Sequence, residues 1–479
     1  MLLSLAALAA FGGSLAAGFV FDDFALFSDP VITSPSGWWE CWRIVQTRPL
    51  TWFTFWANYQ LGHQDPVGYH AVNLALHVGV VLLVWEALRK LIPERAALAA
   101  AALFAVHPIM TEPVAYVFAR GTLLAALLSL LSIRSWVLGR HWIAVVWFTV
   151  AMLAKEECAA LPIFLLLLGK PRNWRAIAAM FGVAIALGLR VVWASAATGG
   201  SGAGAHAGIS PAAYLAEQGG VILRYLRLLV IPCGFTVDPD VSYSWMYWIV
   251  LAGLVFVLAR TRARMWFFGG LVLLAPSSSI FPAADLAADR RMYLPMVAFC
   301  ACAALLLDRV ERRAIAAIVI GLGAISFYYC GLWRSPEALW SEAVKQAPDK
   351  VRPRLQLARA LPPERGLDVL SQAQRLAPDD PSVATEQGRA LLALGRPGEA
   401  LAAFGRALAL DPNDARALNN RGAALIALGQ VDAARADFER ALARDPCLFD
   451  TRVNLLRIGV RTTAPLGCRY TPEQRDLLR

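Results

Sequence analysis

The sequence predicts an all-α protein in which a polytopic membrane helix bundle is followed by a short solenoid of repeated helix pairs. The 479-residue chain is 58% hydrophobic with a mean hydropathy of +0.52 and only 17% charged residues, which is too apolar for a soluble protein of this size. Half of its 80 charged residues fall after Trp333, where the chain also begins to repeat with a period of 34. We therefore expect a membrane domain over residues 1–333 and a repeat domain over residues 334–479.

Eleven apolar runs mark the expected membrane helices. Several are shorter than the ~20 residues that a perpendicular span needs, so we expect some of these helices to be broken. The runs are 2–20, 69–88, 96–107, 121–138, 142–154, 158–169, 175–194, 245–259, 265–280, 292–307 and 314–332.

The first run ends in two adjacent carboxylates, Asp22 and Asp23, where the predicted helix meets water. A polar helix cap is one explanation of the pair. A catalytic carboxylate is the other, because acids at a membrane boundary are costly and often functional. The segment 24–68 that follows is rich in Trp and Pro and is expected to lie as a loop along the lipid interface.

Basic residues follow every second apolar run, as the positive-inside rule requires if the N-terminus is cytoplasmic. The basic residues of these loops therefore set orientation, and the net charge of +10 does not indicate a nucleic-acid partner. With this orientation Asp22 and Asp23 lie on the extracytoplasmic side. The basic loops contain Arg89, Lys90 and Arg95; Arg134 and Arg140; Lys170, Arg172 and Arg175; Arg260, Arg262 and Arg264; and Arg309, Arg312 and Arg313.

One further apolar segment, 211–231, carries Glu217, Arg224 and Arg227. Counting it as a span would place the next basic loops outside, so we expect a re-entrant or interfacial helix. The Gly-rich stretch 199–204 before it is a candidate lid.

Four more polar groups fall on the same side as the two acids. Each alone is explained by a cap, a salt bridge or a histidine satisfied inside a bundle. Together they predict a cavity with an acid pair and several cations, which suits a phosphate-bearing lipid. The groups are the turn from His107 to Glu112 with Arg120 beyond it, the break Lys155-Glu156-Glu157, the loop from Asp285 to Arg291 that ends in Tyr293, and the row His70, Asn73 and His77, which share one helix face.

From about residue 336 the chain repeats, and this period, with small residues at helix crossings, is typical of tetratricopeptide helix pairs. A degenerate unit runs from Trp340 to Pro348, and residues 449–460 are expected to form a capping helix. Such arrays bind extended peptide on a concave face, although a spacer or a dimerisation element is the alternative. The recurring residues are Pro378, Pro412 and Pro446, Gly388 and Gly422, Gly395 and Gly429, Phe404 and Phe438, and Ala407 and Ala441.

The last apolar run is expected to exit outward, which places the repeats outside the cytoplasm. Cys447 and Cys468 would then lie in an oxidising space and could pair. The eight cysteines show no metal-binding spacing, so zinc is not expected.

Five stretches of the membrane half, together with the repeats, resemble one known family, the transmembrane-and-tetratricopeptide-repeat O-mannosyltransferases. This family is a branch of the GT-C membrane glycosyltransferases, so the resemblance implies a GT-C-like bundle. The chain departs from the animal members in having only about three repeats, and its Ala-rich, Arg-over-Lys composition looks bacterial. The stretches are FVFDDF at 19–24, Tyr69 to His77, Leu103 to Val117 with Arg120, Ala154-Lys155-Glu156, and Arg291 to Pro295.

The resemblance implies transfer of one sugar from a polyprenyl-phosphate carrier to a Ser or Thr hydroxyl of a protein acceptor, on the outer face of the membrane and with inversion. A carboxylate must take the hydroxyl proton, and we favour Asp23 narrowly over Asp22 because it lies one residue further into water. A cation must stabilise the leaving phosphate. The expected site comprises Asp22 and Asp23 as catalytic acids; Arg291, Arg290, Lys155 and Arg120 at the donor phosphate; His70, Asn73, His107, Glu112, Glu156 and Tyr293 in the substrate pocket; and Asn419, Asn420 and Arg389 at the acceptor.

Two other functions stay open: an oligosaccharide ligase or polymerase, and a non-catalytic membrane anchor that presents a repeat scaffold. The sugar, the acceptor and the length of the carrier lipid are also open. A divalent cation such as Mg²⁺ or Mn²⁺ is compatible with adjacent Asp residues but is not required by the sequence. The expected location is a bacterial inner membrane with periplasmic repeats.

Overall fold

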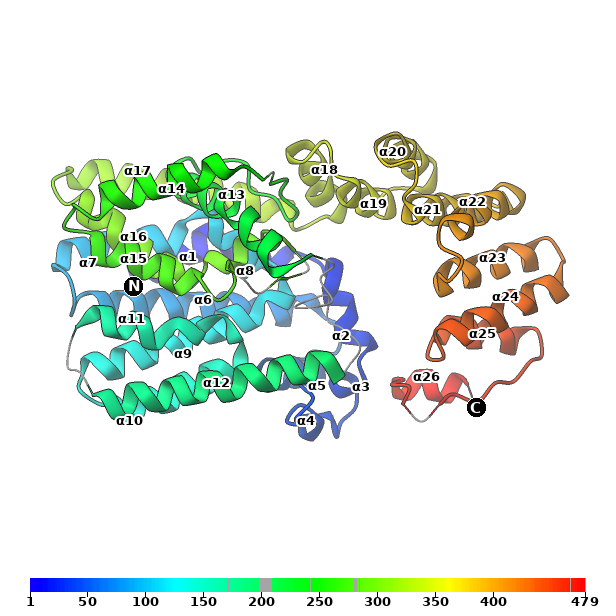
Figure 1. The fold of residues 1–479 in the computed structure, drawn as a ribbon, viewed down its shortest axis with the longest axis horizontal. Coiled ribbons are helices and arrows are strands. Elements are labelled where there is room, and N and C mark those ends of the chain that lie inside the picture. The colour runs from blue at the N-terminus through cyan, green and yellow to red at the C-terminus, as the bar shows by residue number, and fades with distance from the viewer. Residues whose placement is uncertain are drawn as a thin grey trace. The chain divides into compact units, whose positions relative to one another are not determined.

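The computed structural model describes residues 1–169, 173–197, 209–241, 243–279, 282–283, 285–465 and 467–478. The candidate lid at 199–204 lies outside these residues. Over the described part the chain is helical with no strand, which confirms the predicted fold class (Figure 1). It divides into two compact units, Met1–Leu26 with Pro35–Ser335, and Phe27–Ser34 with Pro336–Arg479.

Each of the eleven apolar runs contains a helix of the first unit. Among the described residues four helices are long and apolar enough to cross a membrane, or up to six if each of two bent pairs is one span, so the number of spans stays a prediction. The helices are α1 (Leu2–Phe11), α6 (Pro66–Leu88), α7 (Glu94–Val106), α9 (Arg120–Val137), α10 (His141–Ala154), α11 (Leu161–Leu168), α12 (Trp174–Ala197), α14 (Trp245–Leu258), α15 (Arg264–Leu274), α16 (Pro295–Leu306) and α17 (Arg312–Leu332).

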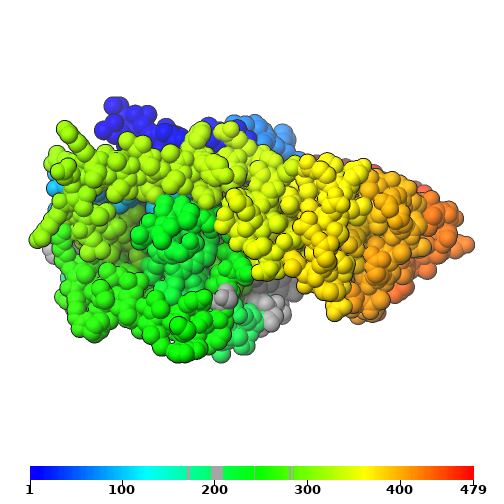
Figure 2. Space-filling view, turned by 90° about the horizontal axis from the view of Figure 1, so that it is seen from above, coloured from blue at the N-terminus to red at the C-terminus, as the bar shows by residue number. Residues whose placement is uncertain are grey.

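The expectation of one continuous helix over residues 2–20 is wrong. Helix α1 ends at Phe11, because the pair Gly12-Gly13 favours helix poorly. A 3₁₀ turn (Gly12–Ala16) and an extended stretch follow, and the chain bends by 59° before the next helical turn. Helix α1 packs along α17, and the dark-blue N-terminal atoms lie beside yellow-green atoms of that helix in Figure 2.

The segment 24–68 is not a loop, as was expected, but contains four helices. They are α2 (Ala25–Ser28), α3 (Pro30–Thr33), α4 (Gly37–Glu40) and α5 (Pro49–Gly62), three of which begin at or next to a proline or glycine. Its tryptophans remain on the surface, with Trp38, Trp39 and Trp42 exposed by 47%, 65% and 44%. This exposure agrees with an interfacial position.

Those basic loops that the structure describes gather at one end of the bundle, and the predicted site residues of the membrane half gather at the other, which we call the site end. Arg95 donates to the Val310 carbonyl, and Arg262 lies 3.5 Å from Asp308, so loops far apart in sequence meet. Helices α6, α9, α10 and α12, which lie side by side in Figure 1, each connect the two ends. The last helix, α17, finishes at the site end, where Trp333 packs on the Tyr116 ring at 5.6 Å.

Helix α13 (Pro211–Val230) lies across the site end. The Tyr214 hydroxyl near its start donates to the Ser277 carbonyl, and the Leu229 carbonyl near its end lies 3.4 Å from His107 Nε2. Both halves of the helix therefore contact residues of the same end. That this helix is re-entrant or interfacial stays a prediction.

The second unit is a stack of antiparallel helix pairs. A Cβ at Gly388 or Gly422 would lie within 2.6 Å of the Phe404 or Phe438 ring, which explains why glycine recurs where the paired helices cross. The helices are α18 (Pro336–Gln346), α19 (Val351–Ala360), α20 (Pro363–Leu376), α21 (Pro381–Ala393), α22 (Pro397–Leu410), α23 (Ala415–Ala427), α24 (Val431–Arg444), α25 (Phe449–Arg457) and α26 (Pro472–Leu477).

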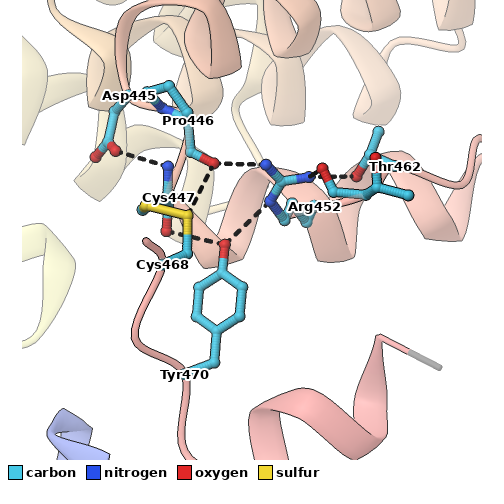
Figure 3. The surroundings of a disulfide bond; sticks show 8 residues. Asp445, Pro446, Cys447, Arg452, Thr462, Cys468 and Tyr470 are labelled. Atoms are coloured by element: carbon cyan, nitrogen blue, oxygen red, sulfur yellow. Dashed lines mark hydrogen bonds between the residues drawn. A yellow bond between two sulfur atoms is a disulfide. The ribbon is translucent and has the colours of Figure 1, made fainter. Parts of the chain in front are cut away.

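A disulfide between Cys447 and Cys468 joins the segment after α25 to the last repeat, which confirms the predicted pairing (Figure 3). The buried Arg452 side chain reinforces it. Its guanidinium donates to Tyr470 Oη at 3.0 Å, to Thr462 Oγ1 and the Thr463 carbonyl at 2.9 Å, and to the Pro446 carbonyl at 2.5 Å.

Candidate functional site

Asp23 is a buried structural acid. One carboxylate oxygen accepts the Val20 N–H at 3.0 Å and the other accepts the Phe118 N–H at 2.8 Å, and the residue is 0% exposed. The expectation that Asp23 lies further into water than Asp22 is therefore wrong. Phe21, directly before the two acids, has a φ of +52°, which is uncommon for a residue other than glycine.

Asp22 is partly exposed and faces Tyr116. The Tyr116 hydroxyl donates to Asp22 Oδ2 at 2.9 Å, which fixes the orientation of the carboxylate. The Arg290 guanidinium carbon lies 5.9 Å from the centre of the Tyr116 ring. A carboxylate and a cation are thus held on one aromatic side chain.

Arg290 is anchored by two acids. Its guanidinium donates to Glu112 and, at 2.8 Å, to Asp285, while its backbone N–H donates to the second Glu112 oxygen at 3.0 Å. Its side chain is 23% exposed. Burial acts to lower the pKa of Arg290, but the two carboxylates outweigh it and raise that pKa, so the cation is permanent. The predicted turn around Glu112 and the predicted loop around Arg290 therefore meet.

Arg291 holds the shape of this loop. Its guanidinium donates to the carbonyls of Asp285, Leu286 and Ser277 and to Tyr214 Oη, and the residue is 7% exposed. Helix α13 supports the same loop through a buried ion pair between Arg224 and Asp289, with a shortest distance of 2.5 Å. Arg291 thus positions its neighbour Arg290.

A second group of charges lies at the break between α10 and α11. Lys155 Nζ contacts Glu157 at 2.6 Å and Thr122 Oγ1 at 2.7 Å, and Arg48 binds both oxygens of Glu156 at 2.5 and 3.1 Å. Burial lowers the pKa of Lys155, and the charges of Arg48 and Arg290 lower it further, while Glu157 opposes them. Burial alone raises the pKa of Glu156, but Arg48 outweighs it and holds that pKa at about 2. Three cations therefore influence one another here.

Arg120, predicted at the donor phosphate, lies in the protein interior. It is 0% exposed and donates to Asn73 Oδ1 at 3.0 Å and to the Thr54 and Tyr69 carbonyls at 3.1 Å. The Asn73 amide in turn donates to the Tyr116 carbonyl at 3.2 Å. Arg120 and Asn73 therefore support the backbone that carries Tyr116.

The predicted pocket histidines and Tyr293 lie beneath the charged groups. His70 is fully buried against the backbone of Ala17 and Gly18. His77 Nδ1 lies 2.8 Å from the Tyr293 hydroxyl, and His107 Nδ1 accepts the Ile109 N–H at 3.2 Å as the cap of the next turn. In this structure these side chains contact protein groups.

The predicted acceptor residues belong to the repeat unit. Asn419 is 8% exposed, and its Oδ1 accepts from Thr451 at 2.9 Å and from Asn454 at 3.1 Å, so it joins α23 to α25. Asn420 is partly exposed. Arg389 is exposed and contacts Glu386 at 2.9 Å.

The described residues contain no group of three His, Cys, Asp or Glu side chains that could hold a metal ion. Sequence reasoning gave no role to Arg48, Tyr116 or Thr122, although each contacts a predicted site residue. Tyr116 lay inside a quoted motif, whereas no pattern drew attention to Arg48.

The repeats match a known family model, the tetratricopeptide repeat, over residues 385–446. Among curated proteins the chain is 27% identical over 354 residues to a protein O-mannosyl-transferase of Caenorhabditis elegans, which covers 66% of this chain and 51% of that protein. It is 28% identical over 406 residues to human protein O-mannosyl-transferase TMTC4, which covers 63% and 53% of the two chains.

The identity is higher over a shorter stretch, with 42% over 125 residues of Drosophila melanogaster protein O-mannosyl-transferase Tmtc1, which covers 25% of this chain and 15% of that protein. The chain thus spans about half the length of the first relatives. Among solved structures, ArnT from Cupriavidus metallidurans bound to undecaprenyl phosphate covers 86% of this chain and 79% of its own, at 14% identity and a TM-score of 0.40, too weak to establish a common fold. The curated relatives confirm the predicted resemblance to the transmembrane-and-tetratricopeptide-repeat O-mannosyltransferases.

Proposed function

We propose that the chain is a membrane glycosyltransferase that moves one sugar from a polyprenyl-phosphate carrier to a Ser or Thr hydroxyl of a protein acceptor, with inversion. The observation that carries this proposal is the group Asp22, Tyr116 and Arg290, in which a partly exposed carboxylate and an anchored cation both contact one tyrosine. The names of the curated relatives add support, since they are protein O-mannosyl-transferases.

In the proposed reaction Asp22 is the general base. The acceptor oxygen forms a bond to the anomeric carbon while the bond from that carbon to the phosphate oxygen breaks, and Asp22 takes the hydroxyl proton. Attack from the face opposite the phosphate inverts the configuration. Asp23 holds the turn that presents Asp22, because both of its oxygens are bound by backbone N–H groups.

Arg290 and Lys155 are the proposed phosphate contacts, with Arg48 behind them. The phosphate leaves with one additional negative charge, which fixed cations stabilise more as the bond breaks. Arg291 and Arg120 are not proposed as phosphate contacts, because their guanidinium groups already donate to carbonyl and side-chain acceptors. Burial and the neighbouring cations lower the pKa of Lys155, and a bound phosphate anion would raise that pKa again because it favours the charged amine.

We further propose that the site end and the repeats face away from the cytoplasm of a bacterial inner membrane, in the periplasm. The disulfide Cys447–Cys468 supports this, because disulfides persist in oxidising compartments. Cysteine labelling of intact cells tests the orientation. A cysteine that replaces Asn420 should react with a thiol reagent that cannot cross the membrane. A cysteine that replaces Arg262 should react with it only after the cells are permeabilised.

The repeats are the proposed acceptor-binding module, with Arg389 and Asn420 as contacts and Asn419 as their support. The activity test uses the purified full chain in nanodiscs with isotopically labelled polyprenyl-phosphate sugars and a Ser/Thr-containing protein. We expect one sugar on the protein and an equal amount of polyprenyl phosphate. Release of free sugar alone, with every acceptor unmodified, would contradict the transferase proposal.

A further inference from the structure

The first helix of each repeat carries the excess positive charge of the repeat unit. The first helices α19, α21, α23 and α25 contain eight arginines and only two acids. The second helices α20, α22 and α24 contain six basic and six acidic residues. The charge asymmetry therefore separates one layer of the solenoid from the other.

Three of the four first helices place an exposed arginine at the same position of the repeat. Arg389 and Arg457 lie two repeat lengths apart, and Arg359 precedes Arg389 by the shorter offset of the degenerate unit. In α23 this position is Ala423, but Arg416, seven residues earlier on the same helix face, is exposed. Consecutive repeats thus present a row of guanidinium groups.

Two arginines of this row share a single acidic partner, which leaves part of their positive charge without a counter-charge. Arg359 and Arg389 both bind the carboxylate of Glu386, at 2.6 and 2.9 Å. The Glu386 side chain is 8% exposed, whereas the two arginines remain 46% and 53% exposed. Two cations share one buried acid, so a net positive charge faces solvent.

The packing of the array brings the row together. Consecutive first helices contact each other, as α19 does α21, α21 does α23 and α23 does α25. Among the described residues, consecutive second helices do not pack against each other as closely as consecutive first helices do. The solenoid therefore bends toward its first helices, and an extended chain laid along them would meet the arginines one after another.

We infer that this first-helix face binds an extended acidic segment of a protein, whose carboxylates pair with Arg359, Arg389, Arg416 and Arg457. Arginine suits carboxylate because its planar fork can donate two hydrogen bonds at once. The partly exposed Asn420 and Asn454, one repeat apart, add amides that can donate to and accept from a peptide backbone. Calling this segment part of the acceptor rests on the proposed function, but its binding does not.

Fluorescence polarisation with the full chain in neutral nanodiscs tests the inference. The probes are three labelled peptides of equal length without Ser or Thr, with Asp/Glu, Asn/Gln or Lys at the same positions. We expect the acidic peptide to bind about tenfold more tightly than the neutral one, with an affinity that falls as salt rises. The variant Arg389→Gln/Arg416→Gln/Arg457→Gln should lose that preference.

The matched control is Arg375→Gln/Arg406→Gln/Arg444→Gln, which removes three exposed charges from the second helices. It should bind the acidic peptide like the wild type, and circular dichroism should show both variants folded. Equal binding of all three peptides, equal loss in both variants, or binding of anionic vesicles in place of peptide would overturn the inference. Acidic-peptide binding without any sugar transfer would leave the inference standing and would count against the proposed function alone.

Discussion

Replacing Asp22 by Asn keeps the shape of the side chain and its contact with Tyr116 but removes the proton acceptor. Loss of a general base typically reduces the rate by about 10² to 10⁴, which corresponds to about 2.7 to 5.4 kcal/mol in the barrier. Because Asp22 is partly exposed and the Tyr116 hydroxyl can also donate to an amide oxygen, stability should change little.

Asp23→Asn should behave differently, which makes the two variants informative together. Both Asp23 oxygens accept buried backbone N–H groups, so an Asn amide must turn its NH₂ toward one of these donors. Leaving that donor unsatisfied costs about 1–3 kcal/mol of stability. We expect Asp23→Asn to lower the melting temperature.

The assay measures single-turnover sugar transfer, donor binding and melting temperature for each variant in nanodiscs. Asp65→Asn is the matched control, because Asp65 caps α6 through the Val67 N–H and Asn caps a helix equally well. A wild-type transfer rate in well-folded Asp22→Asn would refute the assignment of the base.

Four further outcomes are expected. Arg290→Lys should weaken binding of polyprenyl phosphate about tenfold in calorimetric titration, because Lys does not reproduce the guanidinium fork. Arg291→Lys should instead lower the melting temperature in a thermal scan. Weaker phosphate binding in Arg291→Lys, with a lower melting temperature in Arg290→Lys, would contradict these assignments. Polyprenyl phosphate should bind more weakly as pH rises through the lowered pKa of Lys155, because the deprotonated amine no longer attracts phosphate, and Lys155→Arg should remove this dependence; an unchanged pH profile in that variant would exclude Lys155 from the phosphate site. Reducing Cys447–Cys468, which lie 21 residues apart, should destabilise the repeats by about 3 kcal/mol in urea unfolding, and unchanged stability would mean that Arg452 alone holds the segment. A chain ending at Ser335 should still bind polyprenyl phosphate but lose transfer to protein, and loss of both in a folded chain would make the repeats structural.

Local patterns in the sequence predicted the elements of this protein well. Apolar runs marked the helices of the first unit, and the recurrence of Gly388 and Phe404 34 residues later marked the helix crossings of the second. The continuous first helix was wrong because the run is uniformly apolar, and only Gly12-Gly13 signalled its break.

The partners within the site could not be predicted in the same way. Tyr116 meets Asp22 across 94 residues and Arg48 meets Glu156 across 108, and no periodicity specifies such distant contacts. The burial of Asp23 could not be predicted for the same reason, since the N–H of Phe118 that binds it comes from another segment. The positions of the polar residues along the sequence predicted that they lie at the same end of the helix bundle. Only the fold showed which of their side chains are buried.

A cryo-EM map of the full chain with a polyprenyl-phosphate analogue bound tests the central claim most directly. The bundle has cations at both ends, so the location of the phosphate is decisive. We expect the phosphate within hydrogen-bonding distance of Arg290 and Lys155, with its sugar-bearing oxygen toward Asp22. Phosphate bound at the opposite end, among Arg95, Arg262 and the loop around Val310, would contradict it.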